Sequence, residues 1–130
     1  MVLDTSAIAA IFFGEPEAAV FSDRIARTPH CYLSAATLLE SSIALERRFS
    51  PEACDDLDLY IYRAGIETVP VDEAQARLAR RAYRNYGKGN HPAGLNYGDC
   101  FAYALARILR QPLLFKGDDF SMTDLPTVRV

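Results

Sequence analysis

Residues 31–48, CYLSAATLLESSIALERR, join a short apolar run to a longer helical pattern. The apolar run at 31–33 predicts a strand, and Ser34 can cap a helix that continues to about Arg48. A strand followed directly by a long helix is typical of a parallel sheet, because parallel strands need a crossover connection of about a dozen residues or more. The rest of the chain repeats this unit in both directions.

Toward the amino end, residues 1–3 predict a strand that stops at Asp4. Two helices are predicted next, one at 7–13 that Gly14 ends and one from Pro16 to about Arg27. Toward the carboxyl end we expect a helix that starts at 50–52 and stops at Gly65, strands at 67–71, 113–115 and 127–130, and helices at 73–86 and 96–109, with one irregular stretch at 87–94. We therefore predict one three-layer α/β/α domain over residues 1–130, with a central parallel sheet of four to five strands.

The bulk properties indicate a soluble globular protein, since 50% of the residues are hydrophobic and 24% are charged. Acidic residues interrupt the region where a secretion signal would need an apolar stretch, and no run is long enough to span a membrane. Three widely spaced cysteines, Cys31, Cys54 and Cys100, favour a reducing cytoplasm. The net charge of −3 argues against purely electrostatic binding to nucleic acid, unless clustered carboxylates hold divalent cations.

Ligands of open parallel sheets bind beyond the carboxyl ends of the strands, and acidic residues lie at two such positions. Asp4 follows the first predicted strand, and Asp118 and Asp119 follow the fourth. Glu40 and Asp99 lie in helices that begin at the same edge. Both are flanked mainly by apolar residues, and burying an unpaired carboxylate is costly unless a metal ion or amide groups compensate it.

Each acid also has a purely structural explanation. Asp4 could cap the helix that follows it, and the positive end of its own helix could stabilise Asp99. Glu40 could pair with Arg47, and Asp118 and Asp119 could be turn residues. A single metal site explains all of these positions together. Carboxylates favour Mg²⁺ or Mn²⁺, with one or two ions possible, and such a site suits phosphodiester hydrolysis by an activated water.

Four segments carry a resemblance to a known family: Val2–Ala7 (VLDTSA), 33–40 (LSAATLLE), 91–104 (HPAGLNYGDCFAYA) and 114–120 (LFKGDDF). They resemble the PIN domain, and more closely the VapC toxins of bacterial type II toxin-antitoxin systems. The resemblance implies an Mg²⁺-dependent endoribonuclease, with Mn²⁺ as a possible substitute, that cleaves tRNA or other structured RNA and inhibits translation and growth. It also implies a VapB-type antitoxin that blocks the site, and a homodimer formed through helices near the amino end.

By position, the resemblance makes Asp4, Asp99 and Glu40 metal ligands and catalytic acids. The fourth acid is Asp119 or Asp118, of which Asp119 is the more regular position in the family. Thr5 or Ser6 would be the hydroxyl that orients a carboxylate or a water molecule at the metal.

Basic residues near the same edge are candidates for contacting RNA. We expect these contacts from Arg47, Lys88, His91 and Lys116, with Arg48 and Arg84 as further candidates and Tyr97 as a surface for base stacking. For Arg80, Arg81 and Arg84 the sequence favours a merely solvated helix face.

Three other classes of protein compete with this interpretation. A receiver-type signalling domain would use Asp72 and Lys116, but it needs paired acids after its first strand and leaves Glu40 unexplained. A haloacid-dehalogenase-like phosphatase needs a second Asp where this chain has Ser6. A non-catalytic PIN scaffold remains open on the sequence alone.

Overall fold

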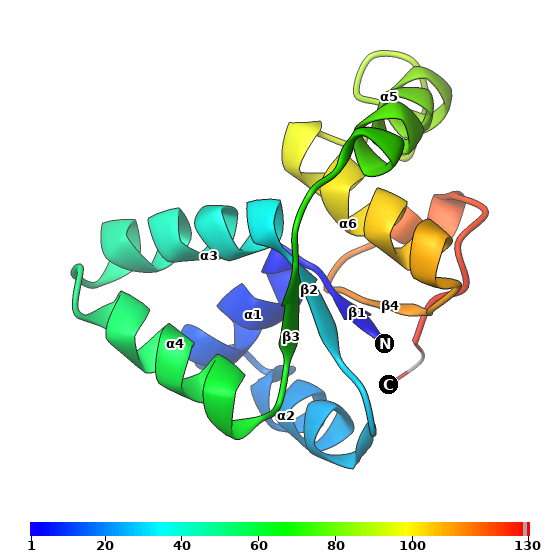
Figure 1. Ribbon diagram of the computed structural model, residues 1–130. Helices are drawn as coiled ribbons and strands as arrows, with labels where there is room; N and C mark the ends of the chain where they lie inside the picture. Colours follow the sequence, from blue (N-terminus) through cyan, green and yellow to red (C-terminus); the bar gives the residue numbers. More distant parts are fainter. Residues whose placement is uncertain (129) are drawn as a thin grey trace.

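The structure is a computed structural model that describes residues 1–128 and 130, and its described part has four strands and six α-helices (Figure 1). The strands are β1 (Val2–Leu3), β2 (Tyr32–Ser34), β3 (Glu67–Val69) and β4 (Leu113–Leu114). The helices are α1 (Thr5–Phe12), α2 (Ala18–Arg27), α3 (Ala35–Arg48), α4 (Ala53–Arg63), α5 (Glu73–Tyr86) and α6 (Tyr97–Leu109), followed by a short 3-10 helix η1 (Asp119–Met122).

The four strands form one parallel sheet in the order β3-β2-β1-β4. Val2 is paired with Tyr32 on one side and with Leu113 on the other, so β1 lies in the interior of the sheet. Because all strands run in the same direction, their carboxyl ends meet at one edge. The segments that follow β1 and β4 therefore start side by side.

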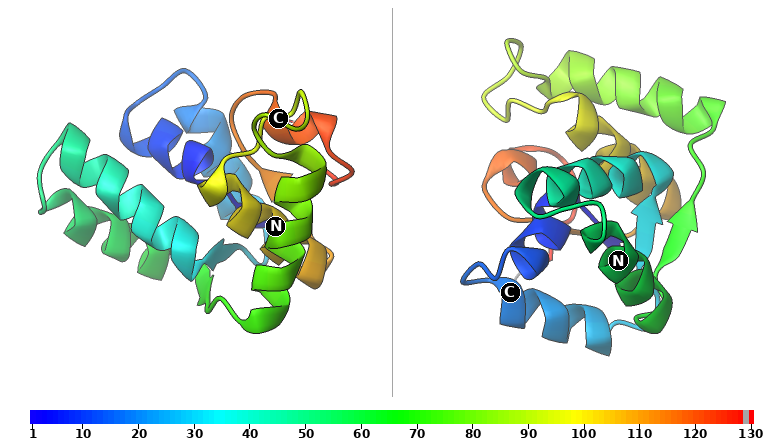
Figure 2. Two further views of the ribbon diagram at one scale, coloured as in Figure 1. Left: turned by 90° about the horizontal axis from the view of Figure 1, so that it is seen from above. Right: turned by 90° about the vertical axis from the view of Figure 1, so that its left-hand side faces the viewer.

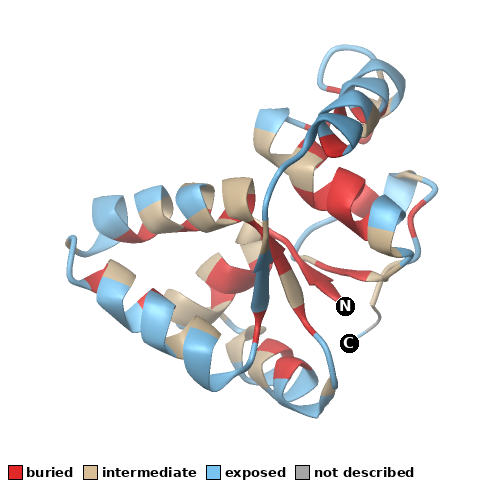
Figure 3. Cartoon of the chain, in the orientation of Figure 1, coloured by how far each residue is buried: buried red, intermediate tan, exposed pale blue. Residues whose placement is uncertain are grey.

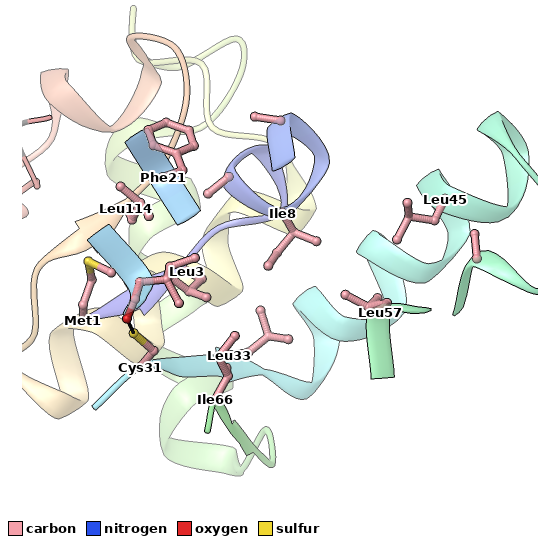
Figure 4. Packing of buried hydrophobic residues seen from close by; sticks show 14 residues of the cluster. Met1, Leu3, Ile8, Phe21, Cys31, Leu33, Leu45, Leu57, Ile66 and Leu114 are labelled. Carbon is pink, nitrogen blue, oxygen red and sulfur yellow. Dashed lines mark hydrogen bonds between the residues drawn. The ribbon is translucent and has the colours of Figure 1, made fainter. Parts of the chain in front are cut away.

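Alternation of side chains along the short strands separates two hydrophobic cores, one on each face of the sheet. Leu3, Leu33 and Leu114 pack on one face with residues from helices α1 to α4 (Figure 4). Val2 and Leu113 point to the other face, where α5, α6 and the segment around Phe120 cover them. Figure 2 shows these helices on the two sides of the sheet, which confirms the predicted three-layer α/β/α arrangement.

Most predicted elements are present with small shifts at their ends. Helix α1 begins at Thr5, two residues before the predicted start, because Asp4 caps it directly. Helix α2 begins at Ala18, two residues after Pro16. No helix among the described residues is both long and apolar enough to cross a membrane.

The fifth predicted strand, at 127–130, is reduced to one isolated parallel bridge between Thr127 and Leu113. Leu113 donates its N–H to Pro126 and accepts a hydrogen bond from the N–H of Val128. Strand β4 is only two residues long, which leaves little backbone for a further strand to pair with. Residue 129 of the predicted strand lies outside the described residues.

Candidate active site

Asp4 lies at the carboxyl end of β1 and is only 3% exposed. Its Oδ2 accepts hydrogen bonds from the backbone N–H of Ser6 at 3.0 Å and from the Ser6 hydroxyl at 2.7 Å. Its Oδ1 is buried and has no hydrogen-bond partner among the described residues. Burial raises the pKa of Asp4, and the hydrogen bonds from Ser6 oppose that rise. The helix-capping explanation therefore accounts for one carboxylate oxygen and leaves the other without a ligand.

Ser6 connects Asp4 to the segment that follows β4. The backbone N–H of Lys116 donates to the Ser6 hydroxyl oxygen at 2.9 Å, and that hydroxyl donates onward to Asp4. Asp4 in turn donates its N–H to the carbonyl of Leu114. Two neighbouring strands thus fix the position of the buried carboxylate.

Asp99 occupies the first turn of α6 and forms a capping box with Asn96. The Asp99 N–H donates to Asn96 Oδ1 at 2.9 Å, and the Asn96 N–H donates to Asp99 Oδ2 at 3.0 Å. Burial nevertheless raises the pKa of Asp99 to about 7, against the hydrogen bond from Asn96 and with the help of negative charge on Asp4, Asp119 and Glu40. The fold therefore brings these four carboxylates into electrostatic contact.

Glu40 reaches the site from the second turn of α3. The Thr5 hydroxyl donates a hydrogen bond to its Oε1. Its other oxygen lies against Gly98, because a Cβ atom built on Gly98 would be 1.9 Å from Glu40 Oε2. Arg47 makes no ion pair with Glu40 in the described part of the chain, so the alternative explanation for Glu40 is not supported.

The structure separates the two candidates for the fourth acid. Both Asp118 and Asp119 are exposed. Asp119 starts η1, and its charge is among the causes that raise the pKa of Asp99. The carbonyl of Asp118 accepts hydrogen bonds from the N–H and hydroxyl of Ser121, which is a turn role. The effect of Asp119 on Asp99 and the turn role of Asp118 support the prediction that Asp119 is the fourth acid.

The cluster fits a hard divalent cation in its chemistry. All its donors are carboxylate oxygens, and the unpartnered Oδ1 of Asp4 is a buried anionic group that needs a positive partner. Within the described residues, no three side chains of metal-binding type are already close enough to surround one ion. Glu40 is partly exposed and Asp119 is exposed, whereas Asp4 is buried.

The basic residues predicted to contact RNA have different surroundings. Lys116 forms ion pairs with Glu15 and, at 3.2 Å, with Glu17, and the hydrogen bond to Glu15 raises its pKa. The ring of His91 packs edge-on against Tyr86 at 5.2 Å, and its Nδ1 accepts the N–H of Ala93. These contacts give both side chains structural partners.

Arg47 and Lys88 are exposed. Arg47 lies seven residues beyond Glu40, which is about 10 Å further along α3 and away from the acidic edge. Lys88 follows the carboxyl end of α5, and its N–H donates to the carbonyl of Leu95, two residues before α6. Of the four predicted contacts, Lys88 therefore combines a position near the start of α6 with the absence of an ion pair among residues 1–128 and 130.

An apolar surface beside the acids was missed by the sequence analysis. A cavity of about 290 Å³ is lined by Leu39, Ile43, Tyr97 and Phe101 together with Glu40 and Gly98. Leu39 and Ile43 are exposed, although the apolar residues around Glu40 had suggested that this part of the helix is buried. The signal in the sequence is the pairing of Leu39 with Ile43 and of Tyr97 with Phe101, each four residues apart on one helix face.

Comparison with known proteins defines the class of this fold and site. The family model of the PIN domain matches residues 1–125. The chain is 51% identical over 128 residues to a ribonuclease VapC of Mycolicibacterium smegmatis, a match that covers 98% of this chain and 99% of the relative. It is 49% identical to ribonuclease VapC30 of Mycobacterium tuberculosis, with 98% of each chain covered. The crystal structure of Mycobacterium tuberculosis VapC20, described as a sarcin-ricin loop cleaving toxin, has the same fold at 18% identity, with a TM-score of 0.80 over 99% of this chain and 98% of that one.

These matches confirm the family that the sequence motifs indicated. The chain belongs to the VapC ribonucleases of the PIN domain family. The receiver and phosphatase alternatives are thereby wrong.

Proposed function

We propose that this protein is a divalent-metal-dependent endoribonuclease that acts as the toxin of a toxin-antitoxin pair. The observation that carries the proposal is the buried, unpartnered Oδ1 of Asp4, on a carboxylate that with Glu40 and Asp119 acts electrostatically on Asp99. The names of the relatives, which are ribonucleases, support the same activity. Structured RNA, including tRNA, is the proposed substrate, and inhibition of translation and growth the proposed result.

The proposed cofactor is Mg²⁺ or Mn²⁺, held by Asp4 and Asp99 with Glu40 and Asp119. A bound ion of this kind supplies Lewis-acid chemistry, which polarises a phosphoryl oxygen and lowers the pKa of water.

Three of the four acids have one oxygen fixed by a neighbouring donor. Ser6 holds Oδ2 of Asp4, Thr5 holds Oε1 of Glu40, and the Asn96 N–H holds Oδ2 of Asp99. Both hydroxyls predicted to orient a carboxylate thus have such a partner. A carboxylate fixed through one oxygen keeps its second oxygen in a defined direction, which prepares the acids for a cation and a phosphate group.

Replacing Ser6 by Ala should show what this fixation contributes. The substitution removes the hydroxyl between Lys116 and Asp4, and we expect metal-dependent cleavage to fall by about 10- to 100-fold. Unfolding free energy should fall by about 1 kcal/mol, since one backbone N–H and one carboxylate oxygen each lose a partner.

The matched control is Ser42→Ala, because the Ser42 hydroxyl donates to the carbonyl of Leu38 in its own helix and has no contact with the acids in the described part of the chain. That variant should retain wild-type cleavage in the same assay. Equal cleavage by the two variants would contradict a positioning role for Ser6.

The proposed partner is a VapB-type antitoxin that covers the acidic edge. The proposed assembly is a homodimer that joins a larger complex with the antitoxin. Exposed apolar side chains on α3 and α6, next to Glu40, are suitable for contact with another protein chain.

The activity can be tested with purified protein freed of antitoxin. A pool of tRNA and other structured RNA is incubated with Mg²⁺ or Mn²⁺, then with EDTA, and then with EDTA followed by excess metal. We expect cleavage that EDTA stops and added metal restores. Cleavage that is insensitive to EDTA would refute the metal dependence.

Metal binding should also stabilise the folded protein. Four neighbouring carboxylates repel one another, and a cation that binds only the folded state raises the melting temperature with its concentration. We expect Mn²⁺ at about 100 times its Kd to add about 2.7 kcal/mol to the free energy of unfolding. Differential scanning calorimetry with Mn²⁺, compared with an EDTA-treated sample and with the Asp99→Asn variant, measures the effect. An equal Mn²⁺-dependent shift in Asp99→Asn would place the ion elsewhere.

A further inference from the structure

Helix α5 and the loop after it concentrate positive charge. Residues 74–96 contain five of the 14 Lys and Arg residues and none of the 17 Asp and Glu residues, so the rest of the chain has nine basic and 17 acidic residues. The five are Arg77, Arg80, Arg81, Arg84 and Lys88. A chain that is acidic as a whole thus has one strongly basic segment.

The four arginines lie on one face of α5. Their spacings of three and four residues place them within an arc of about 100° at 3.6 residues per turn. All four are exposed, whereas Gln75, Ala79 and Ala82 are buried on the opposite face. Figure 3 shows the exposed outer side of α5 and its buried inner side against α6. We call the four arginines and Lys88 the basic face of α5.

Most of these charges have no counter-charge within the protein. Arg77 pairs with Glu73 at 2.5 Å. Across residues 1–128 and 130, Arg80, Arg81, Arg84 and Lys88 have no ion-pair partner. Arg80 and Arg84 are moreover four residues apart, a spacing at which like charges destabilise a helix. The basic face is therefore suited to an anionic partner from outside.

An aromatic surface connects the basic face to the acidic cluster. Arg80 and Tyr83 line a cavity of about 340 Å³ together with Tyr97 and Phe101. Tyr97 and Phe101 also line the cavity that contains Glu40. Tyr97 is 79% exposed and is held edge-on against Phe101 at 4.9 Å. Tyr97 and Phe101 thus border both cavities, one with Glu40 and the other with Arg80, whereas Arg81 lines a separate cavity with Arg107 and Arg110.

We propose that this surface binds an RNA strand beyond the bond that is cleaved, with phosphates on the basic face of α5 and one base stacked on Tyr97. The inference rests on the proposed ribonuclease function and adds a substrate-binding track to it. Arginine-lined grooves with an exposed aromatic ring are the usual means of holding single-stranded nucleic acid, because phosphates meet guanidinium groups and bases stack on the ring. On this proposal Arg80, Arg81 and Arg84 contact phosphates, whereas the sequence favoured a merely solvated helix face for them.

The length of the track has a consequence for the substrate. Arg77 and Arg84 are seven residues apart, which corresponds to about 10 Å along α5, and Lys88 lies beyond the end of the helix. An RNA must therefore extend several nucleotides past the cleaved bond to use the whole face. Short oligonucleotides that cover only the acidic cluster gain nothing from it.

The test compares two triple variants that change the net charge equally. One variant removes three of the five charges of the basic face by Arg80→Gln, Arg81→Gln and Arg84→Gln. The other removes three exposed arginines of α2 and α4 by Arg24→Gln, Arg27→Gln and Arg63→Gln. Binding of a fluorescein-labelled 20-nucleotide single-stranded RNA is followed by anisotropy in EDTA, from 50 to 200 mM salt. We expect the α5 triple to weaken binding at least about tenfold and to reduce the slope of log affinity against log salt by about 2, at about 0.7 per lost phosphate contact. The α2 and α4 triple should match the wild type.

A separate pair of variants tests the aromatic platform. Tyr97→Ala should weaken binding about tenfold and leave the salt slope unchanged, because stacking releases no counterions. Tyr62→Ala on α4, where the ring is 84% exposed, is the control and should bind like the wild type. Melting temperatures of all variants verify that they fold.

The outcomes separate this inference from the proposed function. Equal weakening by the two triple variants would show an effect of net charge alone and would overturn the inference, even if the wild type cleaves RNA with metal. An unchanged salt slope in the α5 triple would also overturn it. The third outcome combines two results: the α5 triple loses RNA binding, and the wild type shows no metal-dependent cleavage. This combination would uphold the binding surface and refute the proposed ribonuclease function.

Discussion

Replacing Asp4 or Asp99 by Asn should reduce metal-dependent RNA cleavage by more than about 100-fold, the upper limit usual for groups that only orient a metal ligand. Asn keeps the size of the side chain but removes the negative charge that a divalent cation requires. Initial rates with a structured RNA pool and Mn²⁺ measure the effect. The control is Asp58→Asn, which removes one exposed carboxylate from α4 without touching the cluster.

The stability of these variants gives a second, opposite signal. In EDTA, Asp99→Asn should unfold at a higher temperature than the wild type, because it relieves repulsion from Asp4, Asp119 and Glu40. Sites built for function carry such costs in stability. If both Asn variants cleave RNA at the wild-type rate, the cluster is not the active site.

The fourth acid can be tested in the same assay with adjacent residues. Asp119→Asn should reduce cleavage strongly and Asp118→Asn only slightly, since the charge of Asp119 raises the pKa of Asp99 and Asp118 has a turn role. The reverse order would assign the fourth position to Asp118.

Replacing Gly98 by Ala should lower cleavage by at least about tenfold although the protein becomes no less stable. The added methyl carbon would lie 1.9 Å from Glu40 Oε2 and 2.6 Å from its Cδ, so the carboxylate must move. A displacement of this size at a ligand is sufficient for a large loss of rate. Ala meanwhile favours a helix over Gly by up to about 1 kcal/mol, and Gly98 lies in the first turn of α6.

A double variant tests whether the effect of Gly98→Ala arises from its contact with the Glu40 carboxylate. Asp at position 40 is one methylene shorter and withdraws from the new methyl group, so Gly98→Ala should cost less in a Glu40→Asp background than in the wild type. The four rates of this cycle, with melting temperatures for each protein, measure the coupling. Additive losses would mean that Gly98 does not act through Glu40.

The sequence was sufficient to predict the layers of the fold and that Asp4, Glu40 and Asp99 lie near one another, whereas their role as metal ligands stays a prediction. Short apolar runs and helix caps are local signals, and the rule that parallel strands share a carboxyl edge turns them into a position for Asp4. Residues 127–130 show the limit of this reasoning. Their pattern predicts a strand, but pairing depends on the length of β4, which contributes two residues.

The surroundings of the basic residues could not be predicted for a similar reason. Lys116 follows a strand at the acidic edge, and its pairing with Glu15 and Glu17 depends on a contact across 101 residues of sequence. The close approach of Gly98 to Glu40 depends on how α3 meets α6. Such contacts depend on tertiary packing, and the local sequence contains no pattern that predicts them.

The uneven distribution of charge described for residues 74–96 also bears on how the molecule meets its substrate in solution. With the positive segment at one extremity and an excess of acids elsewhere, the protein has a permanent electric dipole moment. A polyanion at a distance exerts a torque on such a dipole and turns α5 toward itself before any contact forms. Orientation would then precede recognition, and the rate of encounter would fall with ionic strength even where the final affinity changes little.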